Sequence, residues 1–212
     1  MSLSDEAVYA ARLELVDFVV EVFWDVPSES FLERLLSGEL AFPDREVNES
    51  LDEGFDRLSA FVDVNGDRPI EAVHDDVHSE YTRAFVGPRP PVLPHETNYR
   101  EDTEFLGEGL AEVEASYAAA GWTAPEDYAE ESDFVAVELA FLRHLIDSQR
   151  AGQEEAFGYE RVFLDEHLGT WVPGFTAAVL EECDLGLFHA GALVLDGLVE
   201  FEDELVAQMV SR

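Results

Sequence analysis

The spacing of apolar residues is the feature that most constrains how this chain can fold. Apolar side chains recur every three or four residues almost throughout, and no segment alternates between apolar and polar residues for long enough to form a convincing strand. In the segment 132–150, for example, Phe134, Phe141 and Leu145 fall on one face of a helix. We therefore expect an all-α protein, a single globular bundle of about eight to nine helices over residues 1–212.

Capping residues, glycines and prolines set the expected ends of these helices. We expect the second helix to begin with a capping box of Ser30 and Glu33. The fourth should open at Asp67, with Pro69 in its first turn. The expected helices span about residues 4–24, 30–38, 47–64, 67–85, 103–120, 132–150, 153–168, 171–183 and 188–210.

Residues 87–99 form a long segment whose sequence forbids a helix. The segment, GPRPPVLPHETNY, contains Pro88, Pro90, Pro91 and Pro94. Fixed proline φ angles lower the entropy of the free chain, so such a loop holds a preformed surface. We expect this proline-rich loop to lie between two helical halves of one domain. It would serve either as the wall of a peptide-binding groove or as a structural crossing.

The charge of the chain limits its partners and suggests its habitat. The sequence has 48 Asp and Glu residues against 12 Arg and no Lys, which gives a formal net charge of −36. Because phosphate binding needs a basic face, we expect no nucleic acid partner. Uniform acidity without lysine is typical of proteins that stay hydrated in molar salt, and we interpret it as the mark of a salt-accumulating halophile. Capture of a basic ligand is the alternative interpretation.

The sequence also lacks the patterns of several common sites. The single cysteine, Cys183, excludes a disulfide within the chain and a multi-cysteine metal site. No P-loop, GxSxG or HExxH motif is present. The first 24 residues lack the basic start of a signal peptide, and no uncharged apolar stretch has the length of a membrane span. We expect a cytoplasmic protein without stable membrane insertion.

Two histidines offer one candidate metal site. His74 and His78 stand one helical turn apart, beside Asp75, Asp76 and Glu80. A metal-binding helical protein that uses His74 and His78 is therefore one alternative. The other is a solvated helix face, because carboxylates accompany any histidine by chance in so acidic a chain.

Two carboxylates near residue 135 need an explanation. Glu138 shares the apolar face of its helix, where a carboxylate must have a partner or face a cavity. Its partner would be either an arginine, such as Arg143, Arg161 or Arg83, or a bound ligand. Asp133 stands at the expected start of the same helix, where capping alone would account for it.

Three segments resemble the motifs of the TorD/DmsD/NarJ chaperones in sequence and order. The first is EYTRAFVGP, residues 80–88, followed by PHETNY, residues 94–99. The second is ESDFVAVEL, residues 131–139, and the third is FLDEHLGTW, residues 163–171. Together with the acidic composition, these segments make the chain similar to a haloarchaeal-type member of that family.

The resemblance implies an all-helical, cytoplasmic, non-catalytic chaperone without a cofactor of its own. Such a chaperone binds the twin-arginine signal peptide and apo form of a DMSO-reductase-type molybdoenzyme, and assists cofactor insertion before export. By position, the residues that match those linked with leader binding in the family are Tyr81, Pro94, His95, Glu96, Asp133 and Phe134. Two of them depart from the family pattern, since His95 replaces an aromatic residue and Phe134 replaces a histidine.

A twin-arginine leader presents two guanidinium groups and then an apolar helix, so its receptor should offer carboxylates beside an aromatic groove. The predicted peptide-binding residues are therefore Tyr81, Phe85, Pro94, His95, Glu96, Tyr99, Asp133, Phe134, Glu138 and Trp171. A leader-independent adaptor for an oxidoreductase is the main alternative function. The identity of the client enzyme, binding of a guanine nucleotide and formation of a homodimer stay open.

Overall fold

The chain folds into helices joined by short connections, in a computed structural model that describes residues 3–40, 47–100, 108–124 and 130–210. The α-helices are α1 (Leu3–Phe23), α2 (Glu29–Leu36), α3 (Glu49–Asn65), α4 (Ile70–Tyr81), α5 (Glu108–Ala119), α6 (Val135–Arg150), α7 (Glu155–Phe163), α8 (Gly169–Glu182) and α9 (Gly186–Val210). Two π-helical turns, Thr82–Val86 and Leu164–Leu168, continue α4 and α7, and a 3₁₀ turn spans Glu96–Asn98. The described residues contain no strand, so the expected all-α fold is confirmed.

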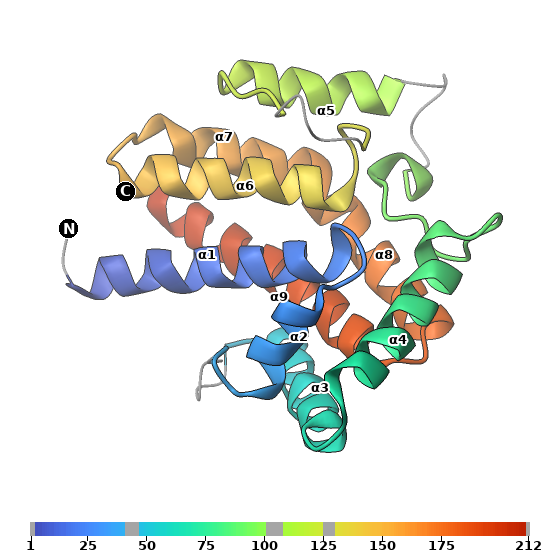
Figure 1. Cartoon of the computed structure of the whole chain (residues 1–212). Helices are drawn as coiled ribbons and strands as arrows, with labels where there is room; N and C mark the ends of the chain where they lie inside the picture. Colours follow the sequence, from blue (N-terminus) through green and yellow to red (C-terminus); the bar gives the residue numbers. More distant parts are fainter. Residues whose placement is uncertain (1–2, 41–46, 101–107, 125–129, 211–212) are drawn as a thin grey trace.

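Helix α9 lies in the middle of the molecule (Figure 1). It packs against α1, α3, α7 and α8, and Leu187, Ala190, Leu195 and Leu198 have no exposed surface. A helix with neighbours on most sides must be apolar around most of its circumference. This requirement explains why the stretch 186–199 carries so few charged residues in so acidic a chain.

The other helices are arranged in layers around α9. Helix α6 packs against both α1 and α7, and α5 lies over α7 at the outer edge. Figure 1 shows α2 and α3 on the opposite side of α1 from α6. Buried apolar side chains from these helices form one cluster that runs from α1 to α9.

The close approach of α3 to α9 depends on Gly197. A Cβ atom at this position would lie 2.6 Å from the backbone nitrogen of Leu51. The side chain of Asn48 completes the joint, because its Oδ1 accepts from the Leu51 amide at 2.9 Å and its Nδ2 donates to the carbonyl of Gly197 at 2.8 Å. The cap of α3 is therefore also a contact with α9.

Several helix starts differ from the expected ones. The predicted capping box of Ser30 and Glu33 is wrong, because the chain becomes helical two residues earlier and the Oγ of Ser28 accepts from the amide of Phe31. Helix α4 begins after Pro69, at Ile70, rather than at Asp67. The expected start of a helix at residue 103 lies outside the described residues.

The expected break between helices at residues 168–171 does not occur. Instead, the chain continues from α7 through the π-helical turn Leu164–Leu168 directly into α8. Gly169 makes this passage possible, since a Cβ atom there would lie 2.7 Å from the carbonyl oxygen of Leu164. The glycine that looked like a helix end therefore permits a continuous helix.

A buried ionic cluster joins four helices at the end of the bundle away from α4. The guanidinium of Arg12 on α1 contacts the carboxylates of Glu160 on α7, at 3.0 Å, and Glu202 on α9, at 2.6 Å. Its Nη1 also donates to the side-chain oxygen of Gln149 on α6 at 2.9 Å. All four side chains are almost completely buried.

None of the described helices combines the length and apolar character that a membrane-spanning segment needs.

Candidate functional site

The end of the proline-rich loop pairs with the residues that precede α6. The amide of Glu96 donates to the carbonyl of Asp133 at 3.0 Å, and the amide of Val135 donates to the carbonyl of Pro94 at 2.9 Å. His95 and Phe134 thereby form an isolated antiparallel bridge. Backbone hydrogen bonds thus hold two segments about 40 residues apart side by side, and Pro94 of the first segment is buried.

Asp133 holds the loop from the other side of this bridge. One carboxylate oxygen lies 3.0 Å from Nδ1 of His95, and the other accepts from the hydroxyl of Thr97 at 2.6 Å and from its amide at 3.3 Å. The explanation of Asp133 as a helix cap is therefore wrong, because Phe134 occupies the cap position and the carboxylate turns toward the loop. Only 1% of Asp133 is exposed.

The surroundings of Asp133 and His95 favour their charged forms. Burial opposes ionisation of Asp133, but hydrogen bonds from His95 and Thr97 outweigh it and lower the pKa of the carboxyl group. Burial likewise opposes protonation of His95, but the contact with Asp133 outweighs it and raises the pKa of the imidazole. The pair therefore acts as an ionic clamp on the loop at pH values between the lowered pKa of Asp133 and the raised pKa of His95.

Glu96 lies at the centre of a second, deeper set of contacts. Its buried carboxylate lies 3.0 Å from Nδ1 of His167 and 2.7 Å from Nη1 of Arg100. The other ring nitrogen of His167 lies 2.9 Å from the hydroxyl of Ser116 on α5. An ionised carboxylate only accepts hydrogen bonds, so the His167 Nδ1–H donates to Glu96. The network thus joins the loop to the π-helical turn after α7 and to α5.

Glu138 on α6 is completely buried, and the indole N–H of Trp171 donates to its Oε2 at 3.1 Å. Its Oε1 accepts no hydrogen bond within the described part of the chain. Burial, and next the carboxylate of the neighbouring Glu96, raise the pKa of Glu138 well above its usual value. A protonated Glu138 can donate to Glu96, which explains how two carboxyl groups share one buried site.

The expected arginine partner of Glu138 is wrong. The three arginines considered for that role contact other carboxylates: Arg143 contacts Asp17 and Asp147, Arg83 contacts Glu80 and Asp184, and Arg161 contacts Asp165. Each of these arginines is nearly half exposed, whereas Glu138 has no exposed surface. Helical periodicity indicated that Glu138 faces inward, but not which group it meets.

The stability of Glu138→Gln relative to the wild type is expected to increase as the pH rises. A folded-state pKa above the unfolded value means that the wild type loses stability above about pH 4.5, the ordinary value for Glu. Gln cannot ionise, and it can still accept from Trp171 and donate to Glu96. We expect its stability relative to the wild type to rise by about 1–3 kcal/mol between pH 5 and pH 8. Urea unfolding at both pH values measures this, and a difference independent of pH would contradict it.

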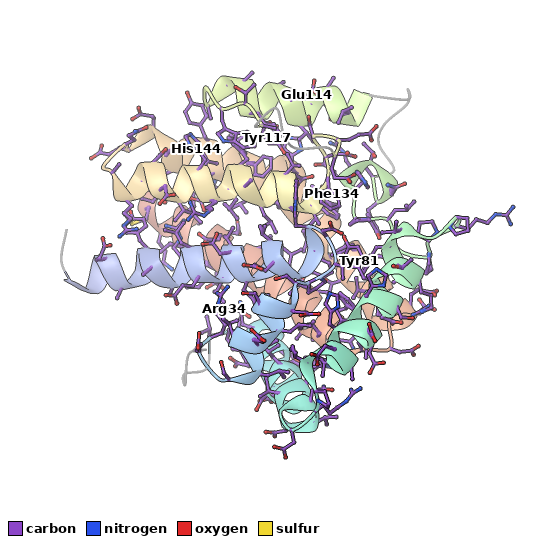
Figure 2. All side chains as sticks on the ribbon, in the orientation of Figure 1. Arg34, Tyr81, Glu114, Tyr117, Phe134 and His144 are labelled. Carbon is purple, nitrogen blue, oxygen red and sulfur yellow. The ribbon has the colours of Figure 1, made fainter. Side chains whose placement is uncertain are left out.

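The predicted aromatic residues divide into three groups. Phe134 contacts Trp24 at the end of α1, with ring centroids 6.0 Å apart, and His95 at 5.3 Å. Tyr99 stacks on Trp171 at 5.7 Å. Tyr81 and Phe85 lie elsewhere, in a core cluster with Phe23 and Phe188, and Figure 2 shows Tyr81 on α4, apart from Phe134 at the start of α6. They are only 4% and 6% exposed.

An open groove lies beside the second network. This α5–α7 groove has a volume of about 890 Å³, and its walls include Tyr99, Arg100, Ser116 and His167. Of the predicted peptide-binding residues, only Tyr99 is among those that line it. The structure therefore brings most of the predicted residues together as a buried frame, with few of them at the surface.

The candidate metal site on α4 is not assembled. The rings of His74 and His78 lie 6.3 Å apart, and the nearest carboxylate to His74 is that of Glu29, at 4.0 Å. Among the described residues, the three side chains whose ligand atoms lie within 4.8 Å of one another are His95, Glu131 and Asp133. Both Asp133 oxygens are already engaged by His95 and Thr97, so hydrogen bonds account for the position of this carboxylate without a metal ion.

Besides Arg100, which contacts Glu96, the sequence analysis missed four residues that complete these contacts. Thr97, Ser116 and His167 extend the networks, and Trp24 covers Phe134. Thr97 and His167 were visible inside the motif segments 94–99 and 163–171. Ser116 and Trp24 carry no comparable signal, because each meets its partner only through tertiary packing.

One comparison with known proteins gives a match. The family model described as nitrate reductase delta subunit matches residues 44–177, which is more than half of the chain. The matched region contains the loop, the start of α6 and the π-helical turn that meet in the networks above. No curated protein and no solved structure matches the chain.

Proposed function

Because the chain belongs to the nitrate reductase delta subunit family, a family of molybdoenzyme maturation chaperones, we propose that it holds a DMSO-reductase-type apo-enzyme by its twin-arginine signal peptide. The protein would retain the enzyme in the cytoplasm while the molybdenum cofactor is inserted, and release it for export afterwards. It would act by binding alone, without catalysis.

One observation supports this proposal more than any other. The three motif segments, which lie far apart in the sequence, meet in one set of buried contacts: Asp133 with Thr97, Glu96 with His167, and Glu138 with Trp171. A buried polar network favours one arrangement of the segments that carry it, because a shift of any segment leaves further buried groups without partners. Such a frame suits a receptor that must present a preformed surface to a flexible peptide.

We propose different tasks for the predicted residues within this frame. Asp133, Glu96 and Glu138 are buried and engaged with the protein's own groups, so we propose that they position the loop. The peptide would instead contact the partly exposed residues beside them, such as His95 and Tyr99. Pro94, Phe134 and Trp171 support that surface from below, while Tyr81 and Phe85 stabilise the core behind it.

Asp133→Ala is expected to weaken leader binding at least tenfold, which is about 1.4 kcal/mol. The change removes the acceptor for His95 and Thr97 and so frees the loop. Asp147→Ala, near the exposed C-terminal end of α6, is a matched control that should leave the affinity unchanged. Calorimetry with a synthetic leader in ~2–3 M KCl, which screens the charge of the protein, measures both. Equal affinities for the two variants would contradict the proposed role of Asp133.

A leader-independent adaptor is the alternative that must be distinguished. The apo-enzyme should therefore be titrated with and without its leader. The proposed chaperone loses most of its affinity when the leader is deleted, whereas an adaptor binds both forms equally well.

A further inference from the structure

We propose that the two guanidinium groups of the leader bind in a groove between the C-terminal half of α1 and α2, on Asp17, Glu21 and Asp25. This inference rests on the proposed function and adds to it the place where the arginine pair is recognised. The groove, called the α1–α2 groove below, lies outside the predicted peptide-binding residues. It also lies outside the region that the family model matches.

The starting point is that the predicted carboxylates cannot meet an arginine from outside. Glu96 and Glu138 have no exposed surface and Asp133 has 1%, and each already contacts groups of the protein itself. Burying two further guanidinium groups beside them would require breaking these contacts, and removing one partner from a buried charged pair is costly. The arginines must therefore meet carboxylates at the surface.

The α1–α2 groove offers such carboxylates on an apolar floor. It has a volume of about 450 Å³, and Val20, Trp24 and Val26 line it together with the three acidic residues. Asp17 and Glu21 lie one turn apart on one side of α1, and Asp25 follows two residues after the helix ends, so the three form a row beside the groove. Asp17 and Glu21 are about half exposed, at 51% and 42%.

The groove continues along α1 into a second, more apolar hollow. Asp17, Glu21 and Arg34 belong to both, and the second hollow adds Leu15, Phe18 and Phe31 to its walls. Glu14 and Glu39 line the second hollow as well, so the two hollows together offer carboxylates above apolar walls. A leader presents two guanidinium groups and an apolar segment, which makes the two surfaces complementary.

The protein's own arginines already occupy part of this row. Arg34 on α2 lies 3.5 Å from Glu21, and Arg143 on α6 lies 2.7 Å from Asp17. Figure 2 shows Arg34 directed toward α1 from the side of α2. No arginine contacts Asp25 within the described ranges. The row thus accepts guanidinium groups in this geometry. One leader arginine can pair with Asp25, and the other would displace Arg34 from Glu21.

Trp24 links the groove to the frame described above. Its ring packs against Phe134 and lines the same groove as Glu21 and Asp25, so a guanidinium bound there would gain cation–π attraction besides the ion pair. Two more exposed carboxylates, Glu130 and Glu131, lie close enough to act electrostatically on His95. A leader on α1 would therefore also contact the loop that Asp133 holds.

A double substitution, Glu21→Gln with Asp25→Asn, tests the assignment. Calorimetry in ~2–3 M KCl compares a synthetic twin-arginine leader with its twin-lysine control. Lysine lacks the planar fork that pairs with carboxylates and stacks on an indole, so the wild type should prefer arginine. In the double variant we expect the affinity for the arginine leader to fall about tenfold and the preference for arginine over lysine to disappear.

Two further variants separate this effect from a loss of overall charge. Asp165→Asn with Glu166→Gln makes the same charge change in the α5–α7 groove and should leave leader binding unchanged. Arg34→Gln removes the internal guanidinium from Glu21 and should strengthen arginine-leader binding several-fold. All of these side chains are exposed, so folding is expected to be unaffected, and circular dichroism checks it.

The outcomes distinguish this inference from the proposed function. If the wild type binds the leader but the α1–α2 double variant keeps its preference for arginine, the groove assignment is overturned while the chaperone function stands. Loss of that preference in the α5–α7 variant instead would place the arginines in the other groove and would also overturn it. If the wild type binds no leader, the proposed function fails first.

Discussion

Arg12→Leu is expected to destabilise the protein by about 3–5 kcal/mol, the range for breaking a buried ion pair by removing one partner. Arg12 is 2% exposed and is the cation that Glu160 and Glu202 share. Leucine would leave two carboxylates in the core without it. Urea unfolding in concentrated KCl measures the loss, and a change below about 1 kcal/mol would contradict this role of Arg12.

The pH dependence provides a second test of the Arg12 cluster. Burial, and next the charge of Glu202, raise the pKa of Glu160 to about 8. The cluster therefore loses stability as the pH rises from about 4.5 to 8. Without Arg12 this loss grows, so the deficit of Arg12→Leu should be larger at pH 8 than at pH 5. Arg143→Leu, which removes two exposed ion pairs, should cost less than about 1 kcal/mol at either pH.

Removal of salt is expected to unfold or loosen the whole protein. The screening length is about 3 Å in 1 M salt and about 30 Å in 10 mM salt, so the net charge of −36 acts across the entire molecule only in dilute buffer. The 12 arginines cannot neutralise 48 carboxylates, even where pairs such as Arg68 with Asp76 form. Far-ultraviolet circular dichroism during dialysis from ~3 M to ~10 mM KCl follows this loss.

Sucrose distinguishes the two ways in which salt could stabilise the fold, screening of charge and stronger burial of apolar surface. Both concentrated salt and sucrose favour burial of apolar surface, but only salt screens charge. Sucrose at matched osmolality should therefore fail to preserve the helices in dilute buffer. Retention of the fold in dilute buffer without any additive would contradict the interpretation of the acidic composition as an adaptation to salt.

The helical fold could be predicted because its signals are local. Apolar periodicity, the end of α3 at Asn65 and the prolines of residues 87–99 each depend on neighbours in the sequence. The error at residues 168–171 arose because a local signal is ambiguous. A glycine is typical of a helix end, but Gly169 lacks the Cβ atom that would meet the carbonyl of Leu164, so here it permits a continuous helix.

The candidate site was predictable as a set of segments but not as a surface. The three motif segments do meet, as their resemblance to one family implied. The sequence could not indicate how deeply each carboxylate is buried, because an exposed carboxylate and a buried one beside the same loop have similar local sequence patterns. Asp133 and Glu138 were expected at the mouth of a groove, and both are buried. The partner of Glu138 is an indole 33 residues away, and no local pattern indicates such a contact.

The most direct test of the chaperone function is a calorimetric titration of the wild-type protein in ~2–3 M KCl with the leader of a molybdoenzyme encoded nearby in the source genome. The twin-lysine form of the same peptide is the control. The account predicts binding in the micromolar range or tighter for the arginine leader and clearly weaker binding for the lysine form. No binding by a protein that circular dichroism shows to be folded, or equal binding of both peptides, would contradict recognition through the twin-arginine leader.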